Sequence, residues 1–132
     1  MNVPYKVFIS ATQNDKEIAK DLAKRLESIG VSVFSVEKSV VVGDVIQTKV
    51  NRALREADEI IMVLTRDSSH SAALISELGM AMVLQKQVVP LLVNLTPSEL
   101  PPMFRQIQAL KYADLPRYFS EISTRAKAAK AA

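Results

Sequence analysis

The amino-acid sequence predicts an α/β fold, a flavodoxin-like doubly wound sheet of five parallel strands in the order 2-1-3-4-5 with helices on both faces. Two observations predict it. Short apolar runs alternate along the chain with longer segments in which apolar residues recur every three or four positions, as in repeated strand–helix units. The central run, EIIMVL at 59–64, is almost continuously apolar, which is typical of a strand covered by helices on both faces.

The individual elements follow from the same alternation. Asn14, with Glu17 three residues later, forms a capping-box-like pair at the start of the first helix, and Gly30 stands where its C-terminal cap belongs. The five helical segments are expected to start near residues 14, 44, 72, 96 and 115. The five strands are expected at 6–10, 31–36, 59–64, 88–93 and 109–112.

The length of 132 residues and the hydrophobic content of 48% fit one compact domain with a real core. We expect this domain to occupy residues 1–124. Residues 125–132 are rich in alanine and lysine and show no apolar stripe, so we interpret them as a solvated helical tail or the start of a linker to a further domain.

Composition excludes several kinds of chemistry. The chain has no cysteine, so it holds neither a disulfide nor a thiolate metal site, and its single histidine, His70, leaves no histidine-based metal site and is expected to be solvated. Three glycines provide neither a G-x-G-x-x-G fingerprint nor a P-loop. A net charge of +3 does not predict direct binding of nucleic acid. No apolar run approaches the ~20 residues that span a membrane, so we expect a cytoplasmic protein.

The candidate site follows from the topology and from one unusual carboxylate. Ligands of such sheets bind beyond the carboxyl ends of the strands where the winding reverses, here after Ser10 and Leu64. The third helix, AALISELGMAMVL at 72–84, contains only Ser76 and Glu77 as polar side chains. It must be covered nearly all round, by its own sheet, by a neighbouring helix or by another copy of the protein. An ionised glutamate there costs several kcal/mol unless it is compensated. Glu77 is therefore a candidate site residue, or it is satisfied by nearby amides or by a basic residue from another element.

The order of these segments, from about Tyr5 to Tyr112, resembles the TIR (Toll/interleukin-1 receptor) domain. Residues 7–10 (VFIS) are similar to its box 1, and residues 37–44 resemble its BB loop, with Gly43-Asp44 matching the loop's end. The family segment S-x-W-C-x-x-E maps onto residues 71–77, so the family's catalytic glutamate corresponds to Glu77. Ala73 replaces the tryptophan of that segment and Leu74 its cysteine.

The resemblance implies an NAD+ glycohydrolase or cyclase that cleaves the nicotinamide–ribose bond, with NAD+ as substrate and no resident cofactor or metal. Glu77 would then stabilise the cationic ribose. Lys38 is expected to contact phosphate or a partner's loop, or to be a solvated loop lysine. Phe34, or a residue from a second subunit, is expected to supply the stacking surface that Ala73 lacks. The full set of expected substrate-binding residues is Ser10, Ala11, Thr12, Phe34, Lys38, Gly43, Asp44, Ser71 and Ala73.

The resemblance also implies self-association with other TIR domains, as a homo-oligomer or filament. The three apolar residues in the middle of the loop, Val40, Val41 and Val42, fit this expectation, or they fold back onto the core. The expected context is bacterial immune, antiphage or stress signalling. A non-enzymatic TIR adaptor is the alternative function, and a nucleoside 2-deoxyribosyltransferase-like enzyme is the second alternative.

Overall fold

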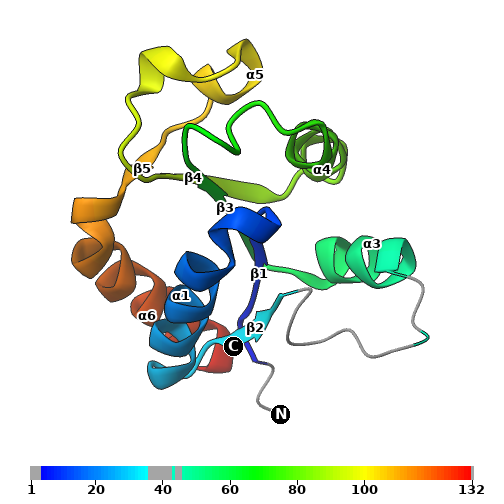
Figure 1. The fold of residues 1–132 in the computed structure, drawn as a ribbon. Helices are drawn as coiled ribbons and strands as arrows, with labels where there is room; N and C mark the ends of the chain where they lie inside the picture. The colour runs from blue at the N-terminus through cyan, green and yellow to red at the C-terminus, as the bar shows by residue number, and fades with distance from the viewer. Residues whose placement is uncertain (1–3, 36–42, 44–45, 132) are drawn as a thin grey trace.

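The computed structural model describes residues 4–35, 43 and 46–131. In it, strands alternate with helices along the chain, as the sequence predicts (Figure 1). The strands are β1 (Lys6–Ser10), β2 (Ser32–Phe34), β3 (Glu59–Leu64), β4 (Gln87–Leu92) and β5 (Leu110–Lys111). The α-helices are α1 (Lys16–Ser28), α3 (Ile46–Glu56), α4 (Ala72–Val83), α5 (Pro102–Arg105) and α6 (Leu115–Ala131).

The five strands form one sheet in the order β2-β1-β3-β4-β5, and every pair of neighbours is parallel. The predicted flavodoxin-like fold is therefore confirmed. Ser10, the last residue of β1, lies opposite Met62 of β3. The two strands that flank the reversal of the winding thus end side by side, and this register brings the loops after them together.

Helices cover both faces of the sheet (Figure 1). Alternate residues along each strand face opposite sides, and the core accordingly forms two clusters. One packs the sheet against α1 and α6, and the other packs it against α3, α4 and α5. All six residues of β3 are buried, which explains why its sequence lacks a polar alternation.

Helix α1 starts differently from the prediction. A 3₁₀ turn over Gln13–Asp15 precedes it, and Asp15 rather than Asn14 occupies the N-cap position, with no side-chain cap hydrogen bond. The predicted capping box at Asn14 and Glu17 was therefore wrong. The end of the helix is as predicted: Gly30 has φ 87°, and the amides of Gly30 and Val31 bond back to the carbonyls of Glu27 and Leu26.

Helix α6 crosses the predicted domain boundary at residue 125. Ala126 is buried in the core, so this helix carries an apolar contact where the sequence was interpreted as a solvated tail. The guanidinium of Arg125 bonds to the carboxylate of Glu59 with N–O distances of 3.1 and 3.2 Å. The sequence did not indicate the buried face of this segment, because its small alanine side chains produce little hydrophobic periodicity.

Candidate functional site

A cleft opens at the carboxyl edge of the sheet, where β1 ends and α1 begins. The described residues enclose a volume of about 160 Å³ there. The last residues of β1 form its floor, the start of α1 forms one wall, and α4 contributes Glu77. Its lining residues are Phe8, Ile9, Ser10, Ala11, Thr12, Gln13, Lys16, Ala19, Lys20, Ser35 and Glu77.

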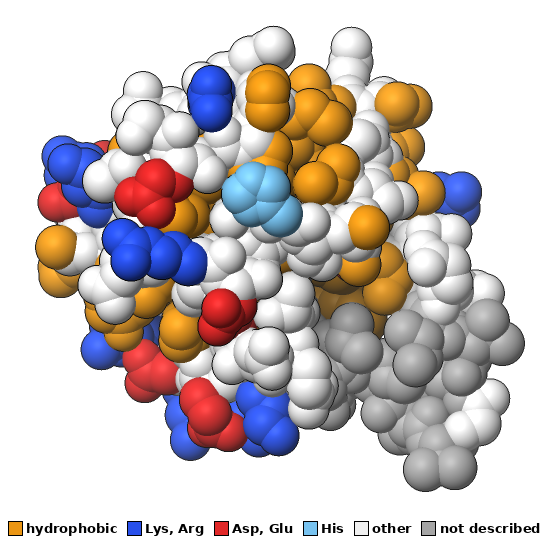
Figure 2. Space-filling view, turned by 45° about the horizontal axis from the view of Figure 1, so that its top comes forward, with side chains coloured by type: hydrophobic (Ala, Val, Ile, Leu, Met, Phe, Trp, Pro, Cys, Tyr) orange, Lys and Arg blue, Asp and Glu red, His pale blue; other side chains and the backbone are white. Residues whose placement is uncertain are grey.

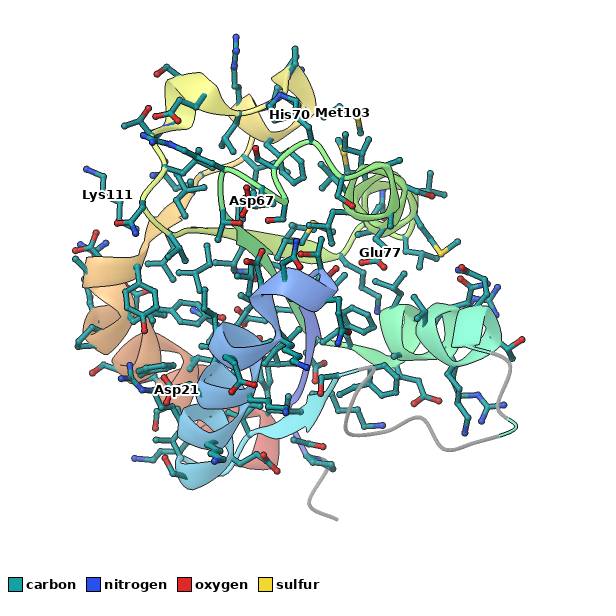
Figure 3. All side chains as sticks on the ribbon, in the orientation of Figure 1. Asp21, Asp67, His70, Glu77, Met103 and Lys111 are labelled. Carbon is teal, nitrogen blue, oxygen red and sulfur yellow. The ribbon has the colours of Figure 1, made fainter. Side chains whose placement is uncertain are left out.

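Ser10 and Glu77 meet in this cleft. Ser10 is only 3% exposed, and its hydroxyl donates a hydrogen bond to the Glu77 carboxylate. The contact joins residues 67 positions apart in the chain. Figure 3 shows Glu77 on α4 directed toward the end of β1, whereas His70 lies apart from it in the loop before α4. The predicted proximity of these two site residues is thus present in the structure.

The environment of Glu77 favours its neutral form. Burial raises the pKa of the Glu77 carboxyl above its usual range, and the hydrogen bond from Ser10 partly opposes this rise. Within the described part of the chain, no cation forms an ion pair with Glu77. The Glu77 carboxyl therefore has a hydroxyl partner but no neutralising cation among the described residues. A carboxyl in a cleft whose pKa is shifted by burial is a candidate functional group.

A second set of polar contacts ties the two loops at this edge together. Asp15 is 6% exposed, and its carboxylate accepts a hydrogen bond from the Thr65 hydroxyl at 3.0 Å. The Thr12 hydroxyl is 3.4 Å from the same carboxylate. The loop after β1 is thereby joined to the loop after β3. The sequence did not single out Asp15, because an aspartate at a helix start normally suggests a cap.

Of the other predicted binding residues, some line the cleft and others lie outside it. Ala11 and Thr12 line the cleft beside Ser10. Phe34 does not line it: its ring stacks on Phe8 with centroids 5.3 Å apart and borders a different hollow beside Ala57. Phe8 is among the lining residues but is only 1% exposed, so no aromatic ring of the described residues is open to the cleft.

The two residues predicted from the start of α4 also lie outside the cleft. Ser71 is the N-cap of α4, and its hydroxyl accepts from the Leu74 amide at 3.4 Å. Ala73 is exposed on the outer side of the helix. Gly43 is exposed with φ 96°, a conformation that favours glycine. The remaining predicted residues lie outside the described ones: Lys38, Val40, Val41, Val42 and Asp44.

Within the described part of this chain helix α4 is covered on one side and exposed on another, so of the expected covers only another copy of the protein could complete it. Leu74, Leu78 and Ala81 face the core, but Met82 is 45% and Val83 83% exposed. Ala72, Ala73, Ser76 and Val83 are exposed and share one side of the helix, which we call the α4 outer face. Figure 2 shows hydrophobic side chains gathered on one side of the histidine, with most charged side chains on the other. The α4 outer face thus carries no charged side chain.

Sequence reasoning missed four polar residues that line the cleft, Gln13, Lys16, Lys20 and Ser35, and three apolar ones, Phe8, Ile9 and Ala19. The four polar side chains looked like ordinary helix and loop surface.

His70 is exposed, as its solvated interpretation predicted, and its ring hydrogen-bonds to the Ser69 hydroxyl. The described residues contain no cluster of carboxylates and histidine that could hold a metal ion. No described helix is both long enough and apolar enough to span a membrane.

The fold and the cleft together define a parallel α/β domain with a carboxylate at the switch point of its sheet. A family model described as the TIR domain matches residues 7–128, and the chain therefore belongs to the TIR-domain family. The match covers the strand before Ser10, the cleft and most of α6, so the tail predicted from residue 125 lies partly inside it. Comparison with curated proteins finds no match.

Solved structures share the fold. The TIR domain of the Toll-related receptor TRR-2 from Hydra magnipapillata has a TM-score of 0.76 at 20% identity, over 92% of this chain and 96% of that one. The CMP N-glycosidase of Clostridium botulinum has 0.63 at 20%, over 90% and 98%. The TIR domains of the Roq1 resistosome, which recognises the effector XopQ, have 0.64 at 22%, over 71% of this chain and 60% of that one.

Proposed function

We propose that this TIR domain cleaves the nicotinamide–ribose bond of NAD+, with the Glu77 carboxylate as its catalytic group. One observation carries the proposal: a carboxylate without an ion-pair partner among the described residues lies in the cleft at the switch point of the sheet, oriented by the Ser10 hydroxyl. NAD+ is the substrate in this proposal, and no resident cofactor or metal is required.

The chemistry suits one carboxylate. Nicotinamide leaves NAD+ as a neutral molecule that takes the bonding electron pair on its ring nitrogen, so no general acid is needed. Positive charge develops on the ribose at C1 and its ring oxygen. A carboxylate that replaces water beside this cation interacts with it more strongly than in bulk solvent, and most strongly in the transition state. Attack by water on C1 then gives ADP-ribose and a proton, whereas attack by a base nitrogen gives a cyclic product.

Ser10 positions the carboxylate in this mechanism. Its hydroxyl uses one lone pair of one Glu77 oxygen, and the remaining lone pairs of the carboxylate can interact with the ribose. Phe8 borders the cleft but is only 1% exposed, so the family aromatic that is Ala73 here has no exposed aromatic replacement among the described lining residues.

The test is NAD+ consumption by concentrated or scaffold-clustered protein, followed by chromatography of the products. We expect Glu77→Ala to lower the turnover by at least about 100-fold, the usual loss when a group that stabilises transition-state charge is removed. Glu121→Ala, which removes an exposed carboxylate on α6, is the matched control and should be unaffected. Turnover that survives Glu77→Ala would refute the assignment, and no turnover of the wild type under any clustering condition would refute the enzyme.

A TIR adaptor that only assembles with other TIR domains is the second candidate function. The α4 outer face favours it, because that face offers exposed apolar surface without charge. Assembly without NAD+ loss would support the adaptor. Exchange of the base of a nucleoside without NAD+ loss would instead indicate the deoxyribosyltransferase-like activity.

The proposed context is bacterial immune or stress signalling. Among the structures of similar fold is a resistosome that recognises a pathogen effector, and this likeness supports the context without extending to the trigger. Survival of phage-challenged bacteria that express the wild type or Glu77→Ala tests it. Equal survival of both cultures would count against a catalytic role in defence.

A further inference from the structure

Lys16 is a cation in the cleft that the proposed chemistry does not use. It is the first residue of α1, it is half-buried, and it lines the same cleft as Glu77. No hydrogen bond or ion pair holds its ammonium group within the described residues. Burying part of a lysine costs side-chain entropy and solvation, so a lysine without a partner in a cleft is arranged for something that enters it.

The charges around the cleft are unequal. Among the described residues that line it, Lys16, Lys20 and Glu77 are charged, two cations and one carboxylate. Lys20 lies one helical turn after Lys16, so the two ammonium groups share a side of α1. Lys20 also forms an ion pair with Glu17, at 3.8 Å between two exposed side chains. The cleft therefore attracts an anion on the α1 side while Glu77 disfavours one on the α4 side.

We infer that Lys16 binds a phosphate of the substrate, so that the site takes nucleotides or dinucleotides in preference to nucleosides. This inference rests on the proposed function, because it assumes that a ribose C1 faces Glu77. The phosphate of a nucleotide is attached at the far end of that same ribose. A volume of about 160 Å³ is below that of sites that enclose whole drug-sized ligands, so the cleft accommodates a ribose and its phosphate while the rest of the molecule projects outward.

Lysine suits this task and its neighbours support it. A flexible stem lets the ammonium group follow a phosphate, and its three donors each reach a different oxygen. Thr12 and Gln13 line the cleft just before Lys16 and supply further polar groups to the same anion. A lysine that merely solubilises the surface would project outward instead of lining the cleft.

The binding experiment compares ADP with adenosine by calorimetric titration of the wild type, Lys16→Ala and Lys24→Ala at one ionic strength. Lys24 is exposed on the same helix and does not line the cleft, so its removal changes the net charge equally. We expect ADP to bind more tightly than adenosine, and Lys16→Ala to weaken only the ADP complex by about tenfold, the value of one charge-assisted hydrogen bond. Lys24→Ala should leave both unchanged.

Three outcomes of the titration overturn the inference: no binding of ADP to the wild type, an effect of Lys16→Ala below about twofold, or an equal effect of Lys24→Ala. A kinetic comparison separates the inference from the proposed function. NAD+ and nicotinamide riboside have the same scissile bond, but only NAD+ carries phosphate. Lys16→Ala should raise the KM for NAD+ about tenfold and leave the riboside unchanged.

The two proposals fail in different ways. If Lys16→Ala weakens ADP binding but NAD+ is never cleaved, the phosphate site stands and the NAD+-cleaving function falls. If NAD+ is cleaved and Lys16→Ala affects NAD+ and nicotinamide riboside equally, the function stands and the phosphate assignment falls.

Discussion

At the scale of single residues, Glu77 derives its properties from where its helix places it. The sequence of an apolar helix does not determine the pKa of a glutamate within it, because that pKa depends on the groups that surround the carboxyl in the fold. Here burial raises that pKa, and the one hydroxyl that approaches it lowers it. Two measurable consequences follow, one for catalysis and one for stability.

Removing the Ser10 hydroxyl should move the pH dependence of turnover. The hydrogen bond from Ser10 stabilises the ionised carboxylate, so Ser10→Ala raises the pKa of Glu77 further. If the ionised form is the active one, the acid limb of kcat/KM shifts to higher pH. Ser35→Ala, which also removes a hydroxyl from the cleft lining, should leave the limb in place. A shift to lower pH in Ser10→Ala would contradict the role given to this hydrogen bond.

Glu77→Gln should stabilise the domain at neutral pH. Because the folded-state pKa lies above the usual glutamate value of 4.5, the protonated carboxyl stabilises the fold below pH 4.5, and this contribution is lost as pH rises through the folded pKa. At pH 7 the ionised group is a cost that glutamine removes, on the order of 1 kcal/mol. Urea unfolding at pH 7 and pH 4 measures it, with Glu121→Gln as the surface control. An equal gain at both pH values would show that ionisation is not its cause.

At the scale of elements, helix α6 depends on one buried cluster. Glu59 is 0% exposed at the start of β3, opposite the end that carries the candidate site. Its carboxylate accepts hydrogen bonds from the hydroxyls of Tyr5 and Tyr118 and from the guanidinium of Arg125. Burial and the nearby Glu59 carboxylate raise the pKa of both tyrosines, which keeps their hydroxyls protonated as donors. The cluster joins α6 and the chain before β1 to the central strand.

Arg125→Met should destabilise the domain by about 3 kcal/mol, because it leaves a buried carboxylate without its cation. Arg117→Met, on the same helix, breaks only an exposed pair with a 4.0 Å separation and should cost less than about 0.5 kcal/mol. Equilibrium unfolding in guanidinium chloride compares the two variants. Equal midpoints would mean that the two tyrosine hydroxyls alone compensate Glu59.

At the scale of the whole molecule, the α4 outer face and the cleft are close together. Glu77 lies on the flank of α4, between the exposed Ala73 and the buried Ala81. A second copy that covers the outer face would therefore approach the cleft and exclude water from it. Exclusion of water strengthens the interaction of Glu77 with a ribose cation, and this links assembly to turnover in the proposed function.

Val83→Lys tests the surface without touching the core, since Val83 is 83% exposed. We expect the variant to keep the midpoint of thermal unfolding within a few degrees and to lose concentration-dependent association, because a lysine is costly to bury against an apolar partner. Analytical ultracentrifugation measures the association. Lys111→Glu, on the distant β5, is the charge-changing control. Unchanged association in Val83→Lys would exclude the α4 outer face as the interface.

Much of the fold was predictable because apolar residues recur with different spacings in strands and in helices, and these spacings can be recognised in the sequence. The bounds of β3 were predicted to the residue, since a continuous apolar run has only one explanation at that length. The edge strands are shorter than predicted: β2 ends at Phe34 and β5 spans only Leu110–Lys111. An edge strand pairs on one side only, so its length depends on its neighbour rather than on its own residues.

Some residues of the candidate site could be predicted from the sequence and others could not. Glu77 and Ser10 could be found from the sequence, one as a charge in an apolar helix and the other as the end of a buried strand at the switch point. Lys16 and Asp15 could not, because a polar residue near the start of a helix has the same local signal whether it faces water or a cleft. Phe34 was wrongly favoured as a cleft residue, since an aromatic side chain gives no indication of which hollow it borders.

The sequence by itself determined the order of the elements, the doubly wound class of fold and the identity of the odd carboxylate, because hydrophobic periodicity and composition are local properties. Only the tertiary structure decided that Ser10 holds that carboxylate, that Lys16 shares its cleft and that Arg125 anchors α6 to Glu59. These contacts join residues far apart in the chain, and their existence depends on strand register and helix rotation, which no local pattern of residues specifies.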